Sequence, residues 1–198
     1  MEAQFVIIQF ESPASYGVRL GTGTTTELNN CVAKGLFAAI LMQGSSIYNC
    51  TGISTGGFGI EMASASARAF NCVGISPATN GFSINGLAEA YNCTALATSG
   101  YAVTMQNDGK FKNGTAKTTY NNANGHGIYI ASNPFSGGFE VVGCEIITAN
   151  ASANAIDGIA SAQGKYAQNS YKGMTTAIGL VTSNLATNTT DAQGNLLL

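Results

Sequence analysis

Few residues of this chain carry reactive side chains, and one group of them matches a hydrolase motif. Gly52-Ile53-Ser54-Thr55-Gly56 has the Gly-x-Ser-x-Gly spacing of serine hydrolases, in which the serine sits on a sharp turn between a strand and a helix. No helical pattern follows Ser54, and Gly74-Ile75-Ser76 repeats the same residue types at the same distance from the preceding cysteine. Ser54 is therefore interpreted as a position in a repeat and not as a nucleophile.

Glycoside hydrolysis needs two carboxylates, about 5–5.5 Å apart for retention or 6.5–9.5 Å for inversion. The acidic residues are Glu2, Glu11, Glu27, Glu61, Glu89, Asp108, Glu140, Glu145, Asp157 and Asp191. Alignment of the apolar segments predicts that Glu61 stacks between Leu41 and Asn85, with Thr104 beyond, so no carboxylate neighbours it. Glu140 and Glu145 are predicted to lie on opposite sides of a corner. No catalytic residue is predicted within one chain, whereas a pair formed across two subunits remains open.

Metal chemistry has little support in the sequence. Asn107-Asp108-Gly109-Lys110 is the one segment that offers acidic calcium ligands beside a basic residue, as pectate-type lyases require, and a polar turn explains it more simply. His126 is the only histidine, and no Cys/His cluster accompanies it. We predict no metal site and no cofactor.

The later part of the chain has longer insertions, around residues 120–126 and 133–138. Loops on a rigid repeat scaffold are where ligand contacts usually lie. Tyr120, Asn122, His126 and Tyr129 are predicted to form a patch that contacts sugars. The alternative is that they are ordinary solvent-exposed loop residues.

A repeat that covers most of the chain must position these residues. An Asn-Cys pair ends at Cys31, Cys50, Cys72 and Cys93, at intervals of 19, 22 and 21 residues, and an aromatic residue precedes the last three copies. Degenerate copies follow at Asn113-Gly114, Gly143-Cys144 and Asn169-Ser170. Between the pairs, short apolar segments alternate with a period of two, which indicates strands and not helices. Self-similarity at this period is typical of a solenoid.

The Asn-Cys pair has a physical interpretation as a corner between strands. Asparagine tolerates the left-handed backbone region better than other non-glycine residues, and stacked asparagines form amide ladders. The predicted ladder consists of Asn49, Asn71, Asn92 and Asn113. Cysteine is small and apolar enough to stack inside the coil. The preceding aromatic residue has the same parity along the chain and is predicted to fill the next inward position, unless the corner shifts that phase. Positions such as Val73 and Phe82 are likewise predicted to be buried.

Composition excludes several classes of function. Charged residues make up 9% of the 198 residues, against about 25% in typical domains. The net charge of −2 leaves no basic footprint for nucleic acid. No apolar run approaches the ~20 residues of a membrane-spanning helix. The five cysteines are odd in number, and side chains stacked in parallel disfavour disulfide geometry, so we predict buried thiols.

Asn-Cys corners, Gly-Ile-x-Ile-like strands and turns of about 21 residues resemble the right-handed parallel β-helix of the pectate-lyase-like superfamily. Within that superfamily, the uncharged surface rich in Ser, Thr, Asn and Gly looks like β-helical segments of phage tailspike and tail-fibre proteins. The resemblance covers about residues 15–181. It implies a parallel homotrimer that binds host-surface polysaccharide, and in many members of this group cleavage of that polysaccharide.

The sequence thus predicts an all-β protein, a single right-handed parallel β-helix of about seven turns over residues 15–181. Residues 1–14 are predicted to cap its end or join an assembly, and residues 182–198 to form an extended tail. Predicted outward positions, whose small members suit subunit packing, are Arg19, Ala39, Gly59, Ser83, Ala102, Tyr129 and Asp157. The expected function is non-catalytic attachment to a host-surface glycan as a virion tail component, in contact with other virion proteins. A polysaccharide-degrading enzyme with an inter-subunit site and a purely structural virion protein are the alternatives.

Overall fold

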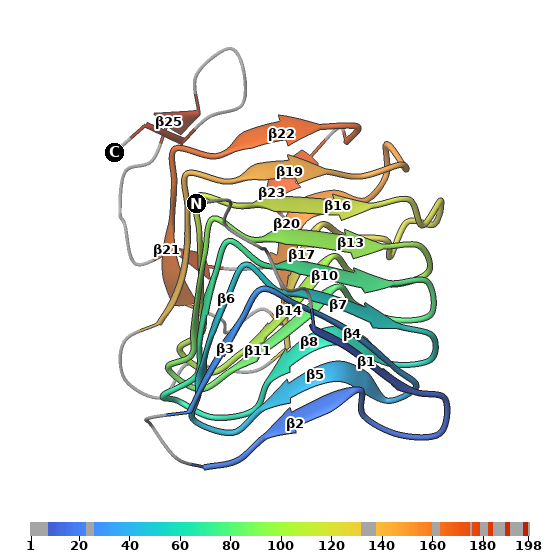
Figure 1. The fold of residues 1–198 in the computed structure, drawn as a ribbon. Coiled ribbons are helices and arrows are strands. Elements are labelled where there is room, and N and C mark those ends of the chain that lie inside the picture. Colours follow the sequence, from blue (N-terminus) through green and yellow to red (C-terminus); the bar gives the residue numbers. More distant parts are fainter. Residues whose placement is uncertain are drawn as a thin grey trace, which may run out of the picture.

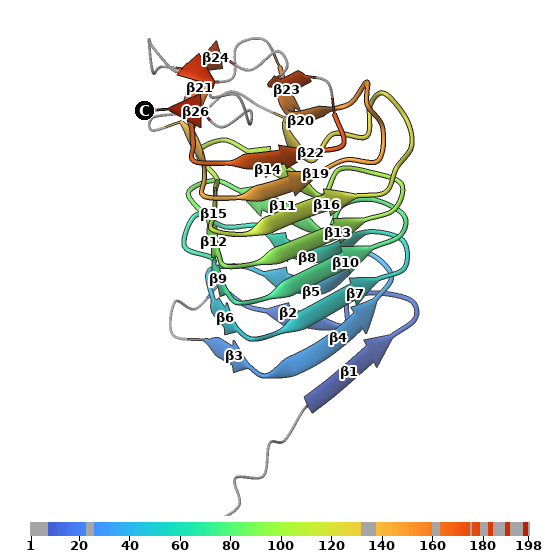
Figure 2. The same cartoon turned by 90° about the horizontal axis from the view of Figure 1, so that it is seen from above.

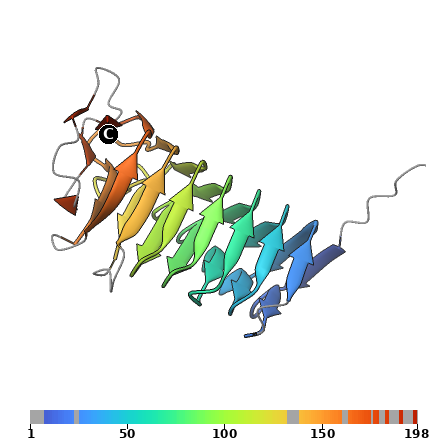
Figure 3. The same cartoon turned by 90° about the vertical axis from the view of Figure 1, so that its left-hand side faces the viewer.

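The chain forms a parallel β-solenoid of about seven turns, with about 22 residues in each turn. The structure is a computed structural model and describes residues 8–22, 26–131, 138–159, 163–174, 176–178, 182–183, 189–190 and 196–197. No helix occurs among these residues. Each turn contributes one strand to each of three eight-stranded sheets, here called A, B and C, and the strands stack in chain order (Figures 1 and 3). The predicted fold class is confirmed.

The strands of each sheet pair in parallel with their counterparts one turn away. Sheet A contains β1 (Ile8–Ser12), β4 (Cys31–Gly35), β7 (Thr51–Ser54), β10 (Val73–Ser76), β13 (Thr94–Ala97), β16 (Thr115–Thr118), β19 (Glu145–Ile147) and β22 (Ser170–Lys172). Sheet B contains β2 (Val18–Leu20), β5 (Ala38–Met42), β8 (Phe58–Met62), β11 (Phe82–Asn85), β14 (Val103–Gln106), β17 (Ile128–Ile130), β20 (Asn154–Gly158) and β23 (Thr176–Ile178). Sheet C contains β3 (Glu27–Asn29), β6 (Ser46–Tyr48), β9 (Arg68–Phe70), β12 (Glu89–Tyr91), β15 (Lys110–Lys112), β18 (Phe139–Val142), β21 (Gln163–Ala167) and β24 (Thr182–Ser183).

The corner between sheets C and A is turned by one residue with positive φ in each turn. Asn30, Asn49, Asn71, Asn92 and Asn113 hold this position with φ of 52–54°. Gly143 and Gln168 hold it in the last turns. The side-chain amide of Asn71 donates to Asn49 Oδ1 at 3.3 Å, which forms one rung of a ladder. The repeat copy predicted at Asn169-Ser170 is one residue out of register, because Ser170 pairs with Glu145 and Gln168 turns the corner.

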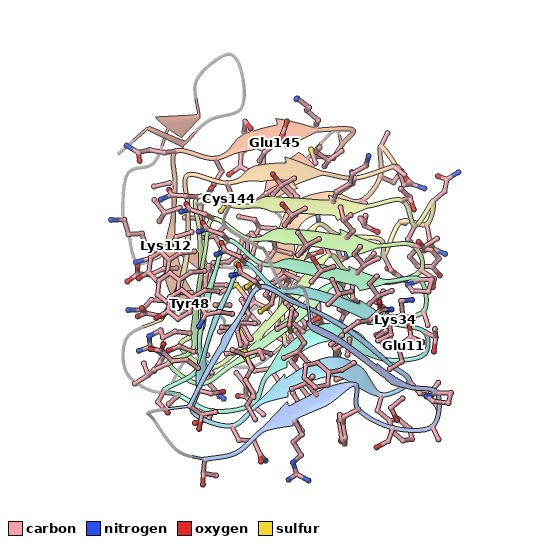
Figure 4. The ribbon with its side chains drawn as sticks, in the orientation of Figure 1. Glu11, Lys34, Tyr48, Lys112, Cys144 and Glu145 are labelled. Atoms are coloured by element: carbon pink, nitrogen blue, oxygen red, sulfur yellow. The ribbon has the colours of Figure 1, made fainter. Side chains whose placement is uncertain are left out.

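The cysteines that follow the corner lie inside the solenoid as buried, unbridged thiols, as predicted (Figure 4 labels Cys144). The thiols of Cys50, Cys72, Cys93 and Cys144 bond to backbone groups at the corner. The Cys50 N–H donates to Cys72 Sγ at 3.4 Å, and the Cys72 thiol donates to the Phe70 carbonyl at 3.2 Å. In the last turn Asn169 replaces cysteine, and its Oδ1 accepts from the Cys144 N–H at 2.8 Å. Burial raises the pKa of the Cys144 thiol to about 11, so this thiol is protonated and inert at neutral pH.

Large and small residues compensate for one another in the core. In the central column of sheet C, Ala69 and Ala90 are followed by Phe111, which is fully buried. A Cβ at Gly114 would lie 2.7 Å from the Phe111 ring, so the ring fills the space that the missing corner cysteine leaves. Burial of such a side chain contributes about 1.5–3 kcal/mol. Phe82 is buried as predicted.

Several predicted side-chain directions are wrong because the chain bends at the corners. The aromatic residues before Asn-Cys lie half-buried on the outer face of sheet C, so they do not fill the core. Val73 is half-buried on the outer face of sheet A. Ala39, Gly59 and Ala102 are buried at the start of their sheet B strands and do not line its outer face.

The bend at sheet B places two consecutive residues inward in each strand. A Cβ at Gly59 would lie 2.7 Å from the Gly74 carbonyl carbon of sheet A, so position 59 faces the interior, and Ile60 beside it is also buried. The outward column therefore runs through Arg19, Leu41, Glu61, Ser83, Thr104, Tyr129 and Asp157. Ser83, and not Asn85, is the neighbour of Glu61.

The two ends of the solenoid contain short strands. β1 lies within the segment 1–14 and is the outermost strand of sheet A (Figure 2). At the other end, β24 within the segment 182–198 pairs with β21 in sheet C, and β25 (Thr189–Thr190) pairs with β26 (Leu196–Leu197) in antiparallel fashion. A role of either segment in capping or assembly remains a prediction.

Candidate functional site

An open groove of about 380 Å³ crosses the turns that lead from sheet A into sheet B. It extends over four successive turns of the solenoid, which at ~4.8 Å per turn corresponds to a length of ~14 Å. Its lining residues are Phe58, Ala78, Thr79, Asn80, Ser99, Gly100, Tyr101, Tyr120 and Asn124. Aromatic rings, amides and hydroxyls therefore line a surface that contains no charged side chain.

Asn80 ties the groove to the scaffold. Its Oδ1 accepts from the Tyr101 N–H at 3.0 Å, and its Nδ2 donates to Thr104 Oγ1 at 2.6 Å. Asn80 lies two residues before β11, and Tyr101 lies two residues before β14. The two residues therefore occupy equivalent positions one turn apart. This turn-to-turn hydrogen bonding holds Tyr101 in place before any ligand binds, which lowers the entropic cost of binding.

Tyr101 also belongs to a stack of three rings on sheet B. The Tyr101 and Tyr129 ring centroids lie 4.5 Å apart with planes 14° from parallel. The His126 ring lies 5.8 Å from Tyr101 and 6.2 Å from Tyr129, also nearly parallel. The three rings come from two adjacent turns, because strand pairing places Thr104 beside Tyr129.

Both nitrogen atoms of His126 are occupied by protein. Nδ1 accepts from the Asn154 N–H at 3.0 Å, and Nε2 lies 3.2 Å from Asp157 Oδ2. Nδ1 accepts only when unprotonated, so this geometry assigns a neutral imidazole that donates from Nε2 to the carboxylate. Burial lowers the pKa of His126, against the opposing charge of Asp157 and the hydrogen bond from Asn154. The imidazole therefore fixes the rings in place and has no free nitrogen for acid–base chemistry.

The tyrosine hydroxyls are the polar groups that the site leaves available. Burial raises the pKa of Tyr101, and the neighbouring Tyr129, Asp157 and Tyr120 raise it further, so the phenol stays protonated at neutral pH. Within the described residues, the hydroxyls of Tyr101, Tyr120 and Tyr129 form no hydrogen bond with protein. Since none of these hydroxyls is a buried, unsatisfied group, each is accessible for hydrogen bonding to solvent or a ligand.

The four residues predicted to contact sugars have different roles in this geometry. Tyr120 lines the groove, and Tyr129 stacks on Tyr101, which lines it. His126 is buried and supports the rings. Asn122 is exposed, and its Oδ1 caps its own loop by accepting from the Asn124 N–H at 3.0 Å. The second predicted loop, residues 133–138, lies outside the described residues except for Gly138.

Sequence reasoning missed Phe58, Asn80 and Tyr101. A strict period of two that makes Ala102 an outward position directs the neighbouring Tyr101 inward, and this hides the outward direction of Tyr101. The sequence does contain a signal for this site. In three successive turns, the same position before the sheet B strand is held by Asn80, Tyr101 and His126, at intervals of 21 and 25 residues. Reading down that column would have placed Tyr101 beside the predicted patch.

Neither Glu61 nor Glu89 supplies the general acid of a glycosidase carboxylate pair. Burial raises the pKa of Glu61, but its neighbours in the column are Leu41 and Ser83. Asp157 lies four turns away, which corresponds to ~19 Å. Burial raises the pKa of Glu89, but hydrogen bonds from Lys110 and Tyr91 and the charges of Arg68 and Lys110 outweigh this, and the net pKa is lowered. A carboxylate of this kind does not serve as a general acid.

The remaining candidates for chemistry are structural. Ser54 is buried, donates to the Leu36 carbonyl at 2.9 Å and accepts from the Gly57 N–H at 2.9 Å. Ser76 makes the equivalent bonds one turn later, which confirms that this serine is a repeat position. Asp108 is buried and accepts from the Gly138 N–H at 3.0 Å. In the described ranges, no three His, Cys, Asp or Glu residues are placed to hold a metal ion.

No protein-family model, curated protein or solved structure matches the chain. The described part of the chain has no helix of the length and apolarity that crossing a membrane requires. The groove is therefore the feature of this chain that points to a function.

Proposed function

We propose that this protein is a virion tail-fibre or tailspike-type attachment protein that binds a host-surface polysaccharide without cleaving it. The observation that carries the proposal is the groove, in which Tyr101 and Tyr120 present rings, and hydroxyls that bond to no described residue, beside the fixed amide of Asn80. Tyrosine combines an apolar ring with a polar tip, which suits the C–H and O–H groups of a sugar. A rigid solenoid that presents few polar groups along an apolar surface suits a linear polymer.

The proposal includes assembly into a homotrimer that contacts other virion proteins. The predicted small-residue packing column on sheet B does not serve this purpose, because Ala39, Gly59 and Ala102 face inward. The outer face of sheet A is better suited to packing between subunits. Its half-buried aliphatic residues are Val32, Ile53, Val73, Ile75 and Leu96. Apolar residues gathered on one outer face mark a surface that suits contact with another protein.

Binding is tested by passing a panel of bacterial surface polysaccharides over the immobilised protein. We expect binding that Tyr101→Ala and Tyr120→Ala weaken, and that Tyr91→Ala on the far sheet leaves unchanged. Binding that none of the three substitutions alters would contradict a site in the groove. Light scattering tests the assembly, and a stable monomer near 20 kDa would contradict the trimer.

The main alternative is a polysaccharide-degrading enzyme with a site between subunits. Release of reducing ends or unsaturated products from the same panel tests it. Steady product release that Glu61→Gln or Asp108→Asn abolishes would replace the attachment function with this one. A protein that neither binds nor cleaves any polymer would support the purely structural role in the virion.

A further inference from the structure

No positively charged side chain of this chain lines the groove. Lys34, Lys117 and Lys172 lie on sheet A, and Arg68, Lys110, Lys112 and Lys165 lie on sheet C. The eighth cation, Arg19, lies on the first strand of sheet B, where it donates to Gln43 Oε1 at 3.2 Å. These are all eight Lys and Arg residues of the chain.

The cation closest to the groove along the chain is also directed elsewhere. Lys117 precedes Tyr120 by three residues, but it lines a separate hollow on the outer face of sheet A with Ile75 and Leu96. Its neighbour Ala116 is buried, as the alternation of the strand requires. Lys117 therefore offers its charge to a different face of the solenoid.

The groove is flanked instead by carboxylates. Glu61 is on the same strand as Phe58, which lines the groove, and the two side chains share the outer face of sheet B. On the other flank, Asp157 accepts from Asn154 Nδ2 at 2.7 Å and contacts His126. Since His126 is neutral in this geometry, it supplies no positive charge opposite Asp157. The charge of Asp157 is felt at Tyr101, whose pKa it raises.

We infer that the groove selects an uncharged polysaccharide and rejects polymers that carry carboxylate or phosphate groups. This inference rests on the proposed function and specifies its ligand. Hydroxyls and ring faces supply every contact that a neutral sugar needs, whereas an acidic sugar would lie between Glu61 and Asp157 with no Lys or Arg among the lining residues to compensate. The repulsion acts across about one Debye length, ~10 Å at 0.1 M salt, so the discrimination is strongest at low ionic strength.

The experiment compares neutral polymers with their own acidic derivatives. Neutral glucans, mannans and galactans, and the same preparations after partial carboxymethylation, are titrated into the full-length protein at 20 mM and 500 mM NaCl. We expect at least one neutral polymer to bind, and its carboxymethylated form to bind at least tenfold more weakly at 20 mM NaCl. At 500 mM NaCl the difference should shrink to a few-fold.

A charge variant at the rim of the groove tests the cause. Ala78 is exposed, lines the groove and has its N–H bonded to Ser76 Oγ, a bond that substitution of the side chain keeps. Ala78→Lys should raise the affinity for the carboxymethylated polymer relative to the neutral one by about five- to tenfold. Ala78→Gln, of similar length and without charge, should leave this ratio unchanged.

The outcomes separate this inference from the proposed function. Equal binding of a neutral polymer and its acidic form, or tighter binding of the acidic form, would overturn the selectivity and leave the attachment function in place. A ratio that Ala78→Gln shifts as much as Ala78→Lys would overturn the electrostatic explanation. If no polymer of either kind binds, both the attachment function and its selectivity fall.

Discussion

Two faces of the solenoid carry stacked tyrosines, and they differ in what the stacks leave unpaired. On sheet C, the Tyr48 and Phe70 rings stack at 5.1 Å and the Phe70 and Tyr91 rings at 5.5 Å, each pair within 8° of parallel. Lys112 Nζ lies 5.8 Å from the Tyr91 ring centroid, and the Tyr91 hydroxyl donates to Glu89 Oε2 at 2.9 Å. Figure 4 shows Tyr48 and Lys112 on the same side of the solenoid. At Tyr91, this stack is therefore completed by protein side chains.

On sheet B, Tyr101 and Tyr129 stack even more closely, but their hydroxyls form no hydrogen bond with the described residues. The groove lies beside them, and the surrounding polar contacts hold the rings without using the hydroxyls. Stacked aromatic residues on a solenoid are therefore not in themselves a sign of binding. An unpaired hydroxyl beside a hollow is the feature that distinguishes a ligand surface from a stabilising one.

The largest expected difference between the two faces is in ligand binding. Tyr101→Ala should weaken polysaccharide binding by about 30-fold, the ~2 kcal/mol typical of a buried aromatic anchor. Tyr91→Ala removes a similar ring from sheet C and should leave binding unchanged while lowering the melting temperature. Isothermal titration against the bound polymer and thermal unfolding of both variants provide the measurements. Equal loss of binding in the two variants would show that the distinction between the faces is wrong.

A second difference is the response to acid through His126. His126→Phe keeps the ring but removes the hydrogen bonds to Asn154 and Asp157, and should cost about 2 kcal/mol of unfolding free energy at pH 7.5. The lowered pKa of His126 means that the wild type loses this stability as pH falls below ~6.5 toward the folded-state pKa. The gap between the two proteins should therefore narrow between pH 7.5 and pH 5. Urea unfolding at several pH values measures it, and a gap that stays constant would contradict the neutral imidazole.

Sequence reasoning recovers the fold because the corner has a local signature. Asn49, Asn71 and Asn92 each need positive φ, which few residues tolerate, and cysteine follows each of them. The directions of side chains between corners are less predictable. At Gly59 and Ile60, two successive residues point inward. A prediction that alternates strictly between inward and outward positions therefore places every earlier residue of the strand on the wrong face.

The candidate site was predicted only in part for a related reason. Tyr120 and Tyr129 stand out because they lie in or beside an insertion, whereas Tyr101 lies in a turn of regular length. The groove collects residues from four turns, and its composition depends on how loops of different length align across the stack. That alignment is a property of the packed solenoid and is absent from any single repeat.

A third test concerns the energy of the closed stack on sheet C. A double-mutant cycle with Tyr48→Leu and Phe70→Leu should give a coupling energy of about 1 kcal/mol, as measured for stacked aromatic pairs. The same cycle with Tyr48→Leu and Tyr91→Leu should give a value near zero, because Phe70 separates the two rings. Chemical denaturation supplies the four free energies of each cycle. Similar coupling in both cycles would indicate a rearranged face in place of discrete ring contacts.

The smallest expected effect on the unfolding free energy is that of the ion pairs beside this stack. Their contribution is lost at a lower pH than the contribution of His126 on sheet B. Glu89 lies 2.9 Å from Lys110 Nζ and 3.3 Å from Arg68 Nε, and all three side chains are partly exposed. Glu89→Gln should cost about 0.5 kcal/mol at pH 7 and less in 1 M salt, where charges at this distance are screened.

The lowered pKa of Glu89 means that this contribution is complete above pH ~4.3 and is lost only as pH falls further. Acid should therefore weaken the His126 contacts of sheet B first and those of Glu89 on sheet C second. A wild-type unfolding free energy that stays level from pH 7 to pH 5 and falls only below pH 4 would show that sheet B makes no separate contribution.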